Sequence, residues 1–138
     1  CHAKAAGLYM ICTLSKQAAE SKGYADALML DWRGRVAEAT GANVFFVDNG
    51  ILHTPEPDCF LDGITRRTVM DLARARGLEI IERAIMPEEM ENFSECFITG
   101  TAAEVTPVSE IGPYKFTPGD ISINLLNDYL ALVGGDIA

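Results

Sequence analysis

Residues 43–54 contain the signal that most restricts the fold of this chain. Asn43–Asp48 has the composition of a β-strand, with Val-Phe-Phe-Val between two polar residues, and Asn49-Gly50 follows directly. An Asn-Gly dipeptide between two apolar runs is typical of a type I′ turn, which joins two antiparallel strands. Residues 51–54 then provide the returning strand. The sequence therefore predicts a β-hairpin in this region.

The other predicted elements place strands and hairpins in the first part of the chain and alternate strands with helices in the second. Apolar residues at helical spacing predict helices, and short apolar runs bounded by turn residues predict strands. The expected helices are residues 8–22, 64–76, 87–90 and 117–133, and the expected strands are residues 27–30, 35–39, 43–48, 51–54, 78–84, 96–99 and 105–111. This order predicts an α+β (mixed α/β) fold.

Some of these elements carry a more specific expectation. Residues 27–30 are expected to form a buried strand, and Pro107 is expected to place its strand at an edge or a bulge of the sheet. Thr117 is the predicted N-cap of the last helix. The predicted apolar face of that helix comprises Leu125, Leu126, Tyr129, Leu132 and Val133.

Length and composition exclude several classes of protein. The chain has 138 residues, the size of a single domain, and its net charge of −9 comes without a basic cluster, so nucleic acid is not an expected partner. It lacks a run of about 18 apolar residues and a signal-peptide pattern, so we expect a cytoplasmic protein without a membrane segment. The four cysteines fit no zinc spacing, and neither histidine has metal-binding partners. No metal site is predicted.

Residues 58–77 contain a candidate anion site. Gly63 precedes a predicted helix that Ile64 and Thr65 open, and a helix start of this kind presents free backbone N–H groups to an anion. The alternative, which this stretch alone favours, is that Asp62 or Thr65 caps a surface helix. The helix itself is predicted from an apolar stripe and a terminal glycine, formed by Val69, Leu72, Ala73 and Gly77.

Three further positions could carry chemistry. Lys4 lies among small residues, where a poorly hydrated amine becomes nucleophilic, although a solvated lysine is the simpler interpretation. Glu38 is either an inward-facing carboxylate with a cationic or protonated partner, or a solvent-facing residue of an edge strand. Thr101 and Ala102 follow Gly100 in a turn of small residues, which either binds an anion through backbone N–H groups or is simply tight.

These features suit one class of ligand, a phosphorylated pyridine aldehyde. The amine would form a Schiff base, the acid would keep the ring nitrogen protonated, and the two turns would hold a phosphate and a carboxylate. Spacing alone does not establish this ligand. The motifs Gly-x-Ser-x-Gly, His-Glu-x-x-His and GxGxxG are absent, so hydrolase and dinucleotide-binding functions have no support.

Four segments together carry a resemblance to a known family. They read AKAAGLY (3–9), LDWRGRVAEATGAN (30–43), LDGITR (61–66) and TGTAAEVTP (99–107). In this order they resemble the C-terminal, cofactor-binding domain of branched-chain amino-acid aminotransferases, which are class IV pyridoxal-phosphate enzymes. The resemblance implies the large domain of the D-amino-acid aminotransferase-like fold, with a central β-sheet or pseudo-barrel flanked by helices. Ala6, Leu8 and Ala39 depart from the family's usual residues and leave substrate preference open.

The resemblance also implies a role for each matching polar position around the reactive end of the cofactor. Lys4 is implied to hold pyridoxal 5′-phosphate as a Schiff base and to shuttle a proton during the reaction. Tyr9 is implied to hydrogen-bond the ring oxygen of the cofactor. Glu38 is implied to pair with the pyridine nitrogen.

The remaining implied contacts lie at the ring face and the phosphate. Leu61 is implied to pack on the ring, and Ile64 and Thr65 are implied to cradle the phosphate. Thr101 is implied to be a second phosphate ligand. The backbone of Thr101 and Ala102 is implied to meet the substrate carboxylate.

The function implied by the resemblance is transfer of the amino group of leucine, isoleucine or valine to 2-oxoglutarate. The alternatives are a D-amino-acid aminotransferase, an aminodeoxychorismate lyase, and a non-catalytic ligand-binding module on the same fold. The resemblance implies that residues 1–138 form one cofactor-binding domain, without the smaller N-terminal domain of the family. The chain begins Cys-His-Ala-Lys without methionine, so it is expected to be a piece of a longer protein. The full-length enzyme is expected to be a homodimer, and the isolated piece is expected to be nearly inactive.

Overall fold

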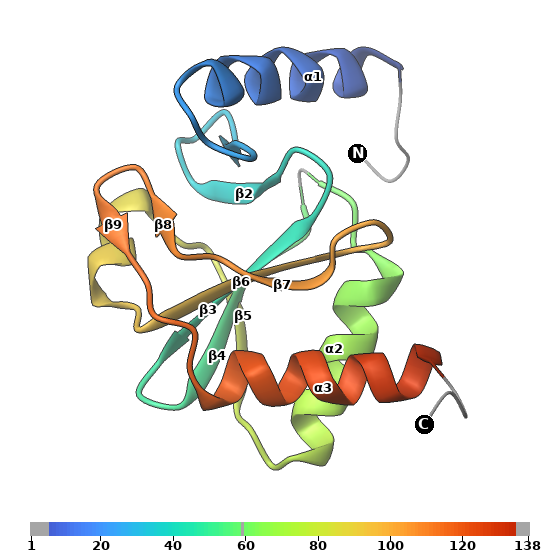
Figure 1. Ribbon diagram of the computed structural model, residues 1–138. Coiled ribbons are helices and arrows are strands. Elements are labelled where there is room, and N and C mark those ends of the chain that lie inside the picture. The colour runs from blue at the N-terminus through green and yellow to red at the C-terminus, as the bar shows by residue number, and fades with distance from the viewer. Residues whose placement is uncertain (1–5, 59, 135–138) are drawn as a thin grey trace.

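Most strands of this chain gather into one mixed sheet with helices on either side (Figure 1). The computed structural model describes residues 6–58 and 60–134, and for residues 6–13 it describes the backbone alone. The helices are α1 (Ala6–Ser21), α2 (Ile64–Ala75), α3 (Asp120–Gly134) and the 3₁₀ helix η1 (Pro87–Asn92). The strands are β1 (Leu28–Leu30), β2 (Val36–Ala39), β3 (Asn43–Asp48), β4 (Ile51–Pro55), β5 (Ile80–Arg83), β6 (Glu95–Gly100), β7 (Glu104–Pro107), β8 (Glu110–Ile111) and β9 (Tyr114–Lys115).

The main sheet has the order β5-β4-β3-β6-β7. Its pairs are antiparallel except β4–β5, which is parallel and is connected through α2. β1–β2 and β8–β9 form separate two-stranded antiparallel hairpins. This architecture confirms the predicted mixed α/β class, and β7 lies at the sheet edge as Pro107 indicated.

The β3–β4 hairpin has the turn that its sequence predicts. Asn49 and Gly50 have φ angles of 51° and 78°, and Asp48 pairs directly with Ile51 across the turn. Positive φ at both central residues is the property of a type I′ turn, whose twist matches that of the strands that it joins. The hairpin therefore forms the centre of the sheet from purely local signals.

Alternate residues of the central strands supply two separate cores, one on each face of the sheet. Phe45 stacks on Phe97 with ring centroids 5.0 Å apart, on the face covered by α2 and α3. Phe46 stacks on Phe93 on the opposite face, which belongs to the core formed with β2 and η1. Side chains of a strand point alternately to its two faces, and each buried phenylalanine contributes about 1.5–3 kcal/mol. Both faces of β3 are therefore buried.

Helix α2 packs on the sheet through the stripe that its sequence predicts. Val69 and Ala73 are fully buried in the core, and Leu72 packs against it. Gly77 has a φ angle of 78°, and the N–H of Leu78 donates to the carbonyl of Ala73 at 3.0 Å, as in glycine-terminated helices. No helix within residues 6–58 and 60–134 combines the length and the apolar content needed to cross a bilayer.

Strand β1 is less buried than expected. Leu30 is 49% exposed, because β1 pairs only with β2 and lies outside the main sheet. The prediction of a buried strand at residues 27–30 was therefore wrong in burial, although a strand does form there.

The last helix differs from its prediction at both ends. It begins at Asp120, which places Gly119 at the N-cap position, and the side chain that binds its first turn is Glu95, not Thr117. Its apolar face is narrower than predicted, since Leu132 and Val133 are 58% and 52% exposed. Ser122, Leu125 and Tyr129 are the residues of the helix that the fold buries.

Candidate active site

The start of α2 is open to an anion. Gly63 occupies the N-cap position with extended backbone angles, and no side chain of the described residues caps the helix. The interpretation that Asp62 or Thr65 caps it was therefore wrong, and Asp62 instead pairs with Arg66 at 2.9 Å. The first turn contains no acidic residue. Its backbone N–H groups, which carry the positive end of the helix dipole, are thus not capped by a side chain of the described residues.

A buried arginine anchors this first turn to the sheet. Arg66 is only 1% exposed, and its Nη2 donates to Glu82 at 2.9 Å and to the carbonyl of Pro55 at 3.1 Å. These bonds fasten the first turn of α2 to the ends of β4 and β5. A cation in the first turn of a helix is unfavourable to the helix itself. Asp62 and Glu82 both pair with Arg66 at 2.9 Å, so the protein itself balances this charge, and Arg66 serves to hold the helix start in place.

The loop before α2 is fastened to the sheet by Asn43, the first residue of β3. Its Nδ2 donates to the carbonyl of Leu61 at 2.9 Å, and its Oδ1 accepts from the N–H of Gly63 at 3.3 Å. A Cβ at Gly63 would lie 2.6 Å from that Oδ1, so the approach requires glycine. Leu61 is half-buried, Thr65 is buried and Ile64 is exposed at this helix start.

The turn between β6 and β7 lies beside the start of α2 (Figure 1). Thr101 and Ala102 are exposed in this turn, which is closed by the pairing of Gly100 with Glu104. A Cβ at Gly100 would lie 3.0 Å from the carbonyl oxygen of Gly41, so two backbones nearly touch at this point. The small residues predicted for this turn therefore serve a close approach to the 40–42 turn as well as any contact with a ligand.

Glu38 belongs to the same neighbourhood through the 40–42 turn. It is half-buried in β2, between the buried residues Ala37 and Ala39. The N–H of Ala39 donates to the carbonyl of Ala42 at 2.8 Å, which places the end of β2 next to the residues that approach Gly100. The fold thus gathers the ends of β2, β6 and the α2 loop around the start of β3.

An ion-pair network gives the β1–β2 hairpin a second link to the α2 loop. Arg35 bonds Asp31 at 3.0 Å and Asp58 at 2.9 Å, and Arg33 bonds Asp58 at 2.6 Å. Burial opposes ionisation of Asp31, but the bonds from Arg35 and Arg33 prevail and lower its pKa to about 2. The carboxylate therefore stays charged at neutral pH and keeps the strand that carries Glu38 connected to the segment before Leu61.

Comparison with known proteins decides the family of this chain. A family model described as amino-transferase class IV matches residues 1–111. The chain belongs to the class IV aminotransferase family. A probable branched-chain-amino-acid aminotransferase of Rickettsia bellii is 46% identical over 136 residues, which cover 96% of this chain and 47% of the relative.

Solved structures of class IV aminotransferases share the fold. The branched-chain aminotransferase from Thermoproteus uzoniensis with norvaline matches 98% of this chain and 46% of its own, with a TM-score of 0.93 and 38% identity. The branched-chain amino acid aminotransferase from Thermobaculum terrenum in its PLP-form matches 96% and 45%, with a TM-score of 0.91 and 40% identity. The recognised family and fold are confirmed, and the chain spans about half the length of these relatives.

The structure does not describe the side chains of two predicted site residues of this class IV aminotransferase chain. Lys4 lies outside the described residues. Tyr9 lies in α1, where only the backbone is described. The roles assigned to them, like those of Glu38, Leu61 and Thr65, stay predictions.

Sequence reasoning assigned no role to Asn43, Arg66 or Thr99, which the fold buries beside the predicted residues. All three lie within the segments that carry the resemblance, and a buried polar side chain needs a partner. Thr99 pairs opposite Asn43 in the sheet, and its hydroxyl has no hydrogen-bond partner among the described residues. The signal that could have identified Asn43 is an amide at the first position of an otherwise apolar strand.

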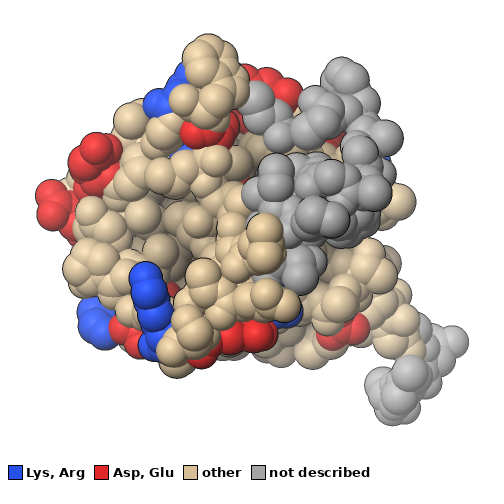
Figure 2. All heavy atoms as spheres, turned by 90° about the horizontal axis from the view of Figure 1, so that it is seen from above, with Lys and Arg blue, Asp and Glu red and all other residues tan. Residues whose placement is uncertain are grey.

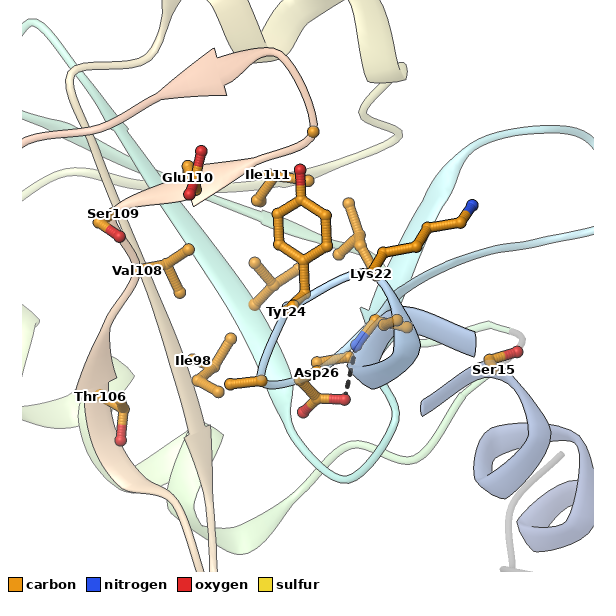
Figure 3. A pocket seen from close by; sticks show the side chains of 18 of the residues that line it. Ser15, Lys22, Tyr24, Asp26, Ile98, Thr106, Val108, Ser109, Glu110 and Ile111 are labelled. Carbon is orange, nitrogen blue, oxygen red and sulfur yellow. Dashed lines mark hydrogen bonds between the residues drawn. The ribbon is translucent and has the colours of Figure 1, made fainter. Parts of the chain in front are cut away.

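A large pocket lies elsewhere in the described chain, beneath the C-terminal half of α1 (Figure 3). It has a volume of about 750 Å³, with Tyr24 and Asp26 on one side and Ile98, Thr106 and Val108 on the other. Seen from above, the described part of this face is largely uncharged around a hollow, and the charged side chains lie toward the rim (Figure 2). Those predicted site residues that the structure describes do not line this pocket.

Proposed function

We propose that this chain forms the cofactor-binding part of a branched-chain amino-acid aminotransferase, which transfers the amino group of leucine, isoleucine or valine to 2-oxoglutarate. One observation carries the proposal: the uncapped start of α2, the β6–β7 turn and the strand of Glu38 meet around the start of β3. The names of the relatives support the same activity. Residues 1–138 would then form a single domain that works together with a second domain of the full-length enzyme.

Pyridoxal 5′-phosphate (PLP) fits the residues at this place. Its phosphate is a dianion, and the start of α2 offers uncapped N–H groups in a first turn without an acidic residue. Ile64 and Thr65 would bind the phosphate through this first turn, and Thr101 would bind it from the neighbouring turn. The Thermobaculum terrenum relative, which was solved in its PLP-form, supports this cofactor.

The remaining predicted residues would hold the ring and the substrate. When bound, the cofactor supplies an electron-accepting ring that makes the Cα proton of the amino acid removable. The half-buried carboxylate of Glu38 would keep a proton on the ring nitrogen, Leu61 would cover the ring face, and Tyr9 would bond the ring oxygen. The backbone at Ala102 would receive the substrate carboxylate.

Lys4 would carry the reaction itself. Its amine would hold the cofactor covalently between turnovers, and it would then move the proton at Cα as general base and acid. The motif segment that contains Lys4 supports this role by resemblance. A homodimeric full-length enzyme is part of the same proposal.

The experiment that tests this function is spectral and chemical. The full-length protein is expected to absorb near ~410 nm, and borohydride reduction is expected to leave the cofactor attached to Lys4 in a tryptic peptide. A reduced adduct on another lysine, such as Lys16, or no adduct would contradict the mechanism. A panel of L- and D-amino donors then separates a branched-chain transaminase from a D-amino-acid aminotransferase or a lyase of the same family.

A further inference from the structure

We propose that Asn43 is a positioning residue of the cofactor site, which holds the loop 61–63 and the start of α2 in the geometry that the cofactor needs. The inference rests on the proposed function and adds to it a residue that is not expected to touch cofactor or substrate. Asn43 stands at the point where the loop, the sheet and the 40–42 turn meet.

The amide of Asn43 is engaged on both sides. Asn43 is 5% exposed, its Nδ2 donates to the carbonyl of Leu61, and its Oδ1 accepts from the N–H of Gly63. The residue itself is fixed, because it pairs with Thr99 at the start of β3 and the next strand residue, Val44, is buried. A buried amide on a rigid strand transmits the position of the sheet to the loop.

The side chain of Asn43 meets both hydrogen-bonding demands of this loop. The loop presents one backbone acceptor and one backbone donor two residues apart, so the bridging side chain must both donate and accept. Aspartate accepts but does not donate, alanine does neither, and glutamine is longer by one methylene. The missing Cβ of Gly63 completes the fit, since a methyl group there would overlap Oδ1 of Asn43.

This bridge sets two parts of the proposed site at once. The bond to Leu61 fixes the residue proposed to cover the cofactor ring. The bond to Gly63, the N-cap residue of α2, fixes the direction of the free N–H groups proposed to hold the phosphate. Loss of the bridge is therefore expected to weaken cofactor binding although the proposed ligands themselves remain.

A double-mutant cycle in the full-length protein tests the inference, with the dissociation constant of pyridoxal 5′-phosphate measured on the apo protein. Asn43→Ala is expected to raise this constant roughly ten-fold or more, because the carbonyl of Leu61 and the N–H of Gly63 both lose their partner. Gly63→Ala is also expected to raise it several-fold. Gly63 has ordinary φ and ψ angles of −67° and 151°, so among the described residues it is the contact with Asn43 that makes alanine unfavourable there.

The coupling between the two changes is the deciding result. Asn43→Ala removes the oxygen that the methyl group introduced by Gly63→Ala would overlap, so the double variant is expected to bind the cofactor no more weakly than Asn43→Ala alone. Fold-changes that simply multiply would overturn the inference. A dissociation constant for Asn43→Ala within two-fold of wild type would overturn it as well.

Two further variants separate positioning from general stability. Ser122→Ala removes a buried hydroxyl that donates to Glu95 at 2.6 Å. Glu95 begins β6, whereas Thr99 lies near the other end of that strand, so the change is expected to lower the melting temperature without changing cofactor affinity. If Asn43→Ala fails to fold, Asn43→Asp takes its place. Asn43→Asp keeps the acceptor for the N–H of Gly63 but loses the donor to Leu61, and it is expected to bind the cofactor more weakly than wild type. Equal affinity of Asn43→Asp and wild type would then count against the inference.

Measurement of cofactor binding by the wild-type protein separates the proposed function from the proposed role of Asn43. If the wild-type protein binds the cofactor and the Asn43 variants bind it equally well, only the positioning role falls. If the wild-type protein binds no cofactor, the proposed function and the role of Asn43 fall together.

Discussion

The starts of α2 and α3 are built alike, yet they differ in what completes them. Each follows a glycine at the N-cap position, and in each case a Cβ on that glycine would strike the side chain that anchors it, Asn43 or Glu95. At α3 the anchor is an anion: Oε1 of Glu95 accepts from the N–H of Gly119 at 2.9 Å and from the N–H of Ser122 at 3.0 Å. At α2 the anchor is a neutral amide that leaves the first turn open.

Charge divides the two helix starts in the same way. Asp120 and Glu95 place negative groups at the start of α3, which satisfies the helix dipole within the protein. The start of α2 has a buried arginine and no acidic residue in its first turn. A helix start completed by a carboxylate of the protein is structural, whereas one that stays uncapped and has no acid in its first turn is suited to an external anion.

The largest expected effect comes from removing the anion of α3. Glu95→Ala removes the acceptor that the N–H groups of Gly119 and Ser122 and the buried hydroxyl of Ser122 share, and it is expected to cost about 3 kcal/mol of unfolding free energy. The measurement is thermal unfolding of the apo protein, with affinity for pyridoxal 5′-phosphate determined below the transition. Cofactor affinity is expected to be unchanged, and a loss of more than two-fold would contradict the division between the two helices.

Removing the cation of α2 is expected to affect both stability and binding. Arg66→Met leaves Asp62 and Glu82 without their partner at the buried end of the pair and is expected to cost about 2 kcal/mol of stability. It is also expected to weaken cofactor binding roughly ten-fold, because the first turn of α2 loses its bonds to Pro55 and Glu82. Arg66→Lys serves as the control that keeps the charge, and equal loss of affinity in both variants would show that geometry outweighs charge here.

A smaller effect is expected at the hydroxyl of the first turn of α2. Thr65→Val preserves the shape of a buried side chain and removes only the hydroxyl, so stability is expected to change by less than about 0.5 kcal/mol. The affinity for the cofactor is expected to fall about five-fold, which corresponds to the net loss of about 1 kcal/mol that is typical of one hydrogen bond. Titration of the apo protein, followed at the absorbance of the bound cofactor, gives this ratio directly.

The smallest effect uses the anion alone. Inorganic phosphate added to the apo protein is expected to raise its melting temperature by a few degrees, about 1 kcal/mol of linkage, because it binds the folded state at α2. The rise is expected to persist in Ser122→Ala and to disappear in Arg66→Met. An equal rise in both variants would indicate a general salt effect and no site at α2.

These contrasts also mark which features the sequence alone could reveal. The hairpin at Asn49-Gly50 and the termination of α2 at Gly77 depend on neighbouring residues, and both were predicted correctly. The cap of α3 comes from Glu95, 24 residues before Gly119, so local reasoning chose Thr117 instead. The burial of residues 27–30 was overestimated for the same reason, since it depends on which strands lie beside them.

The candidate site follows the same rule. The segments around Leu61, Thr65 and Thr101 could be identified because their motifs resemble a family, but their meeting place could not. Asn43 lies 18 residues before Leu61, and no spacing in the sequence indicates that its amide reaches the loop. Arg66 reads as an ordinary surface arginine until β4 and β5 close over it.

The near contact of Gly100 with the backbone of Gly41 has a consequence for engineering the β6–β7 turn. The turn rests on a crossing of two backbones, and Glu104 on its far side has a φ angle of 54°. This turn is therefore expected to accept other side chains at Ala102, which is exposed, but not a change in its length. An inserted residue would lift the turn off the crossing and change the lining of the proposed site as a whole, whereas a substitution would change one wall of it.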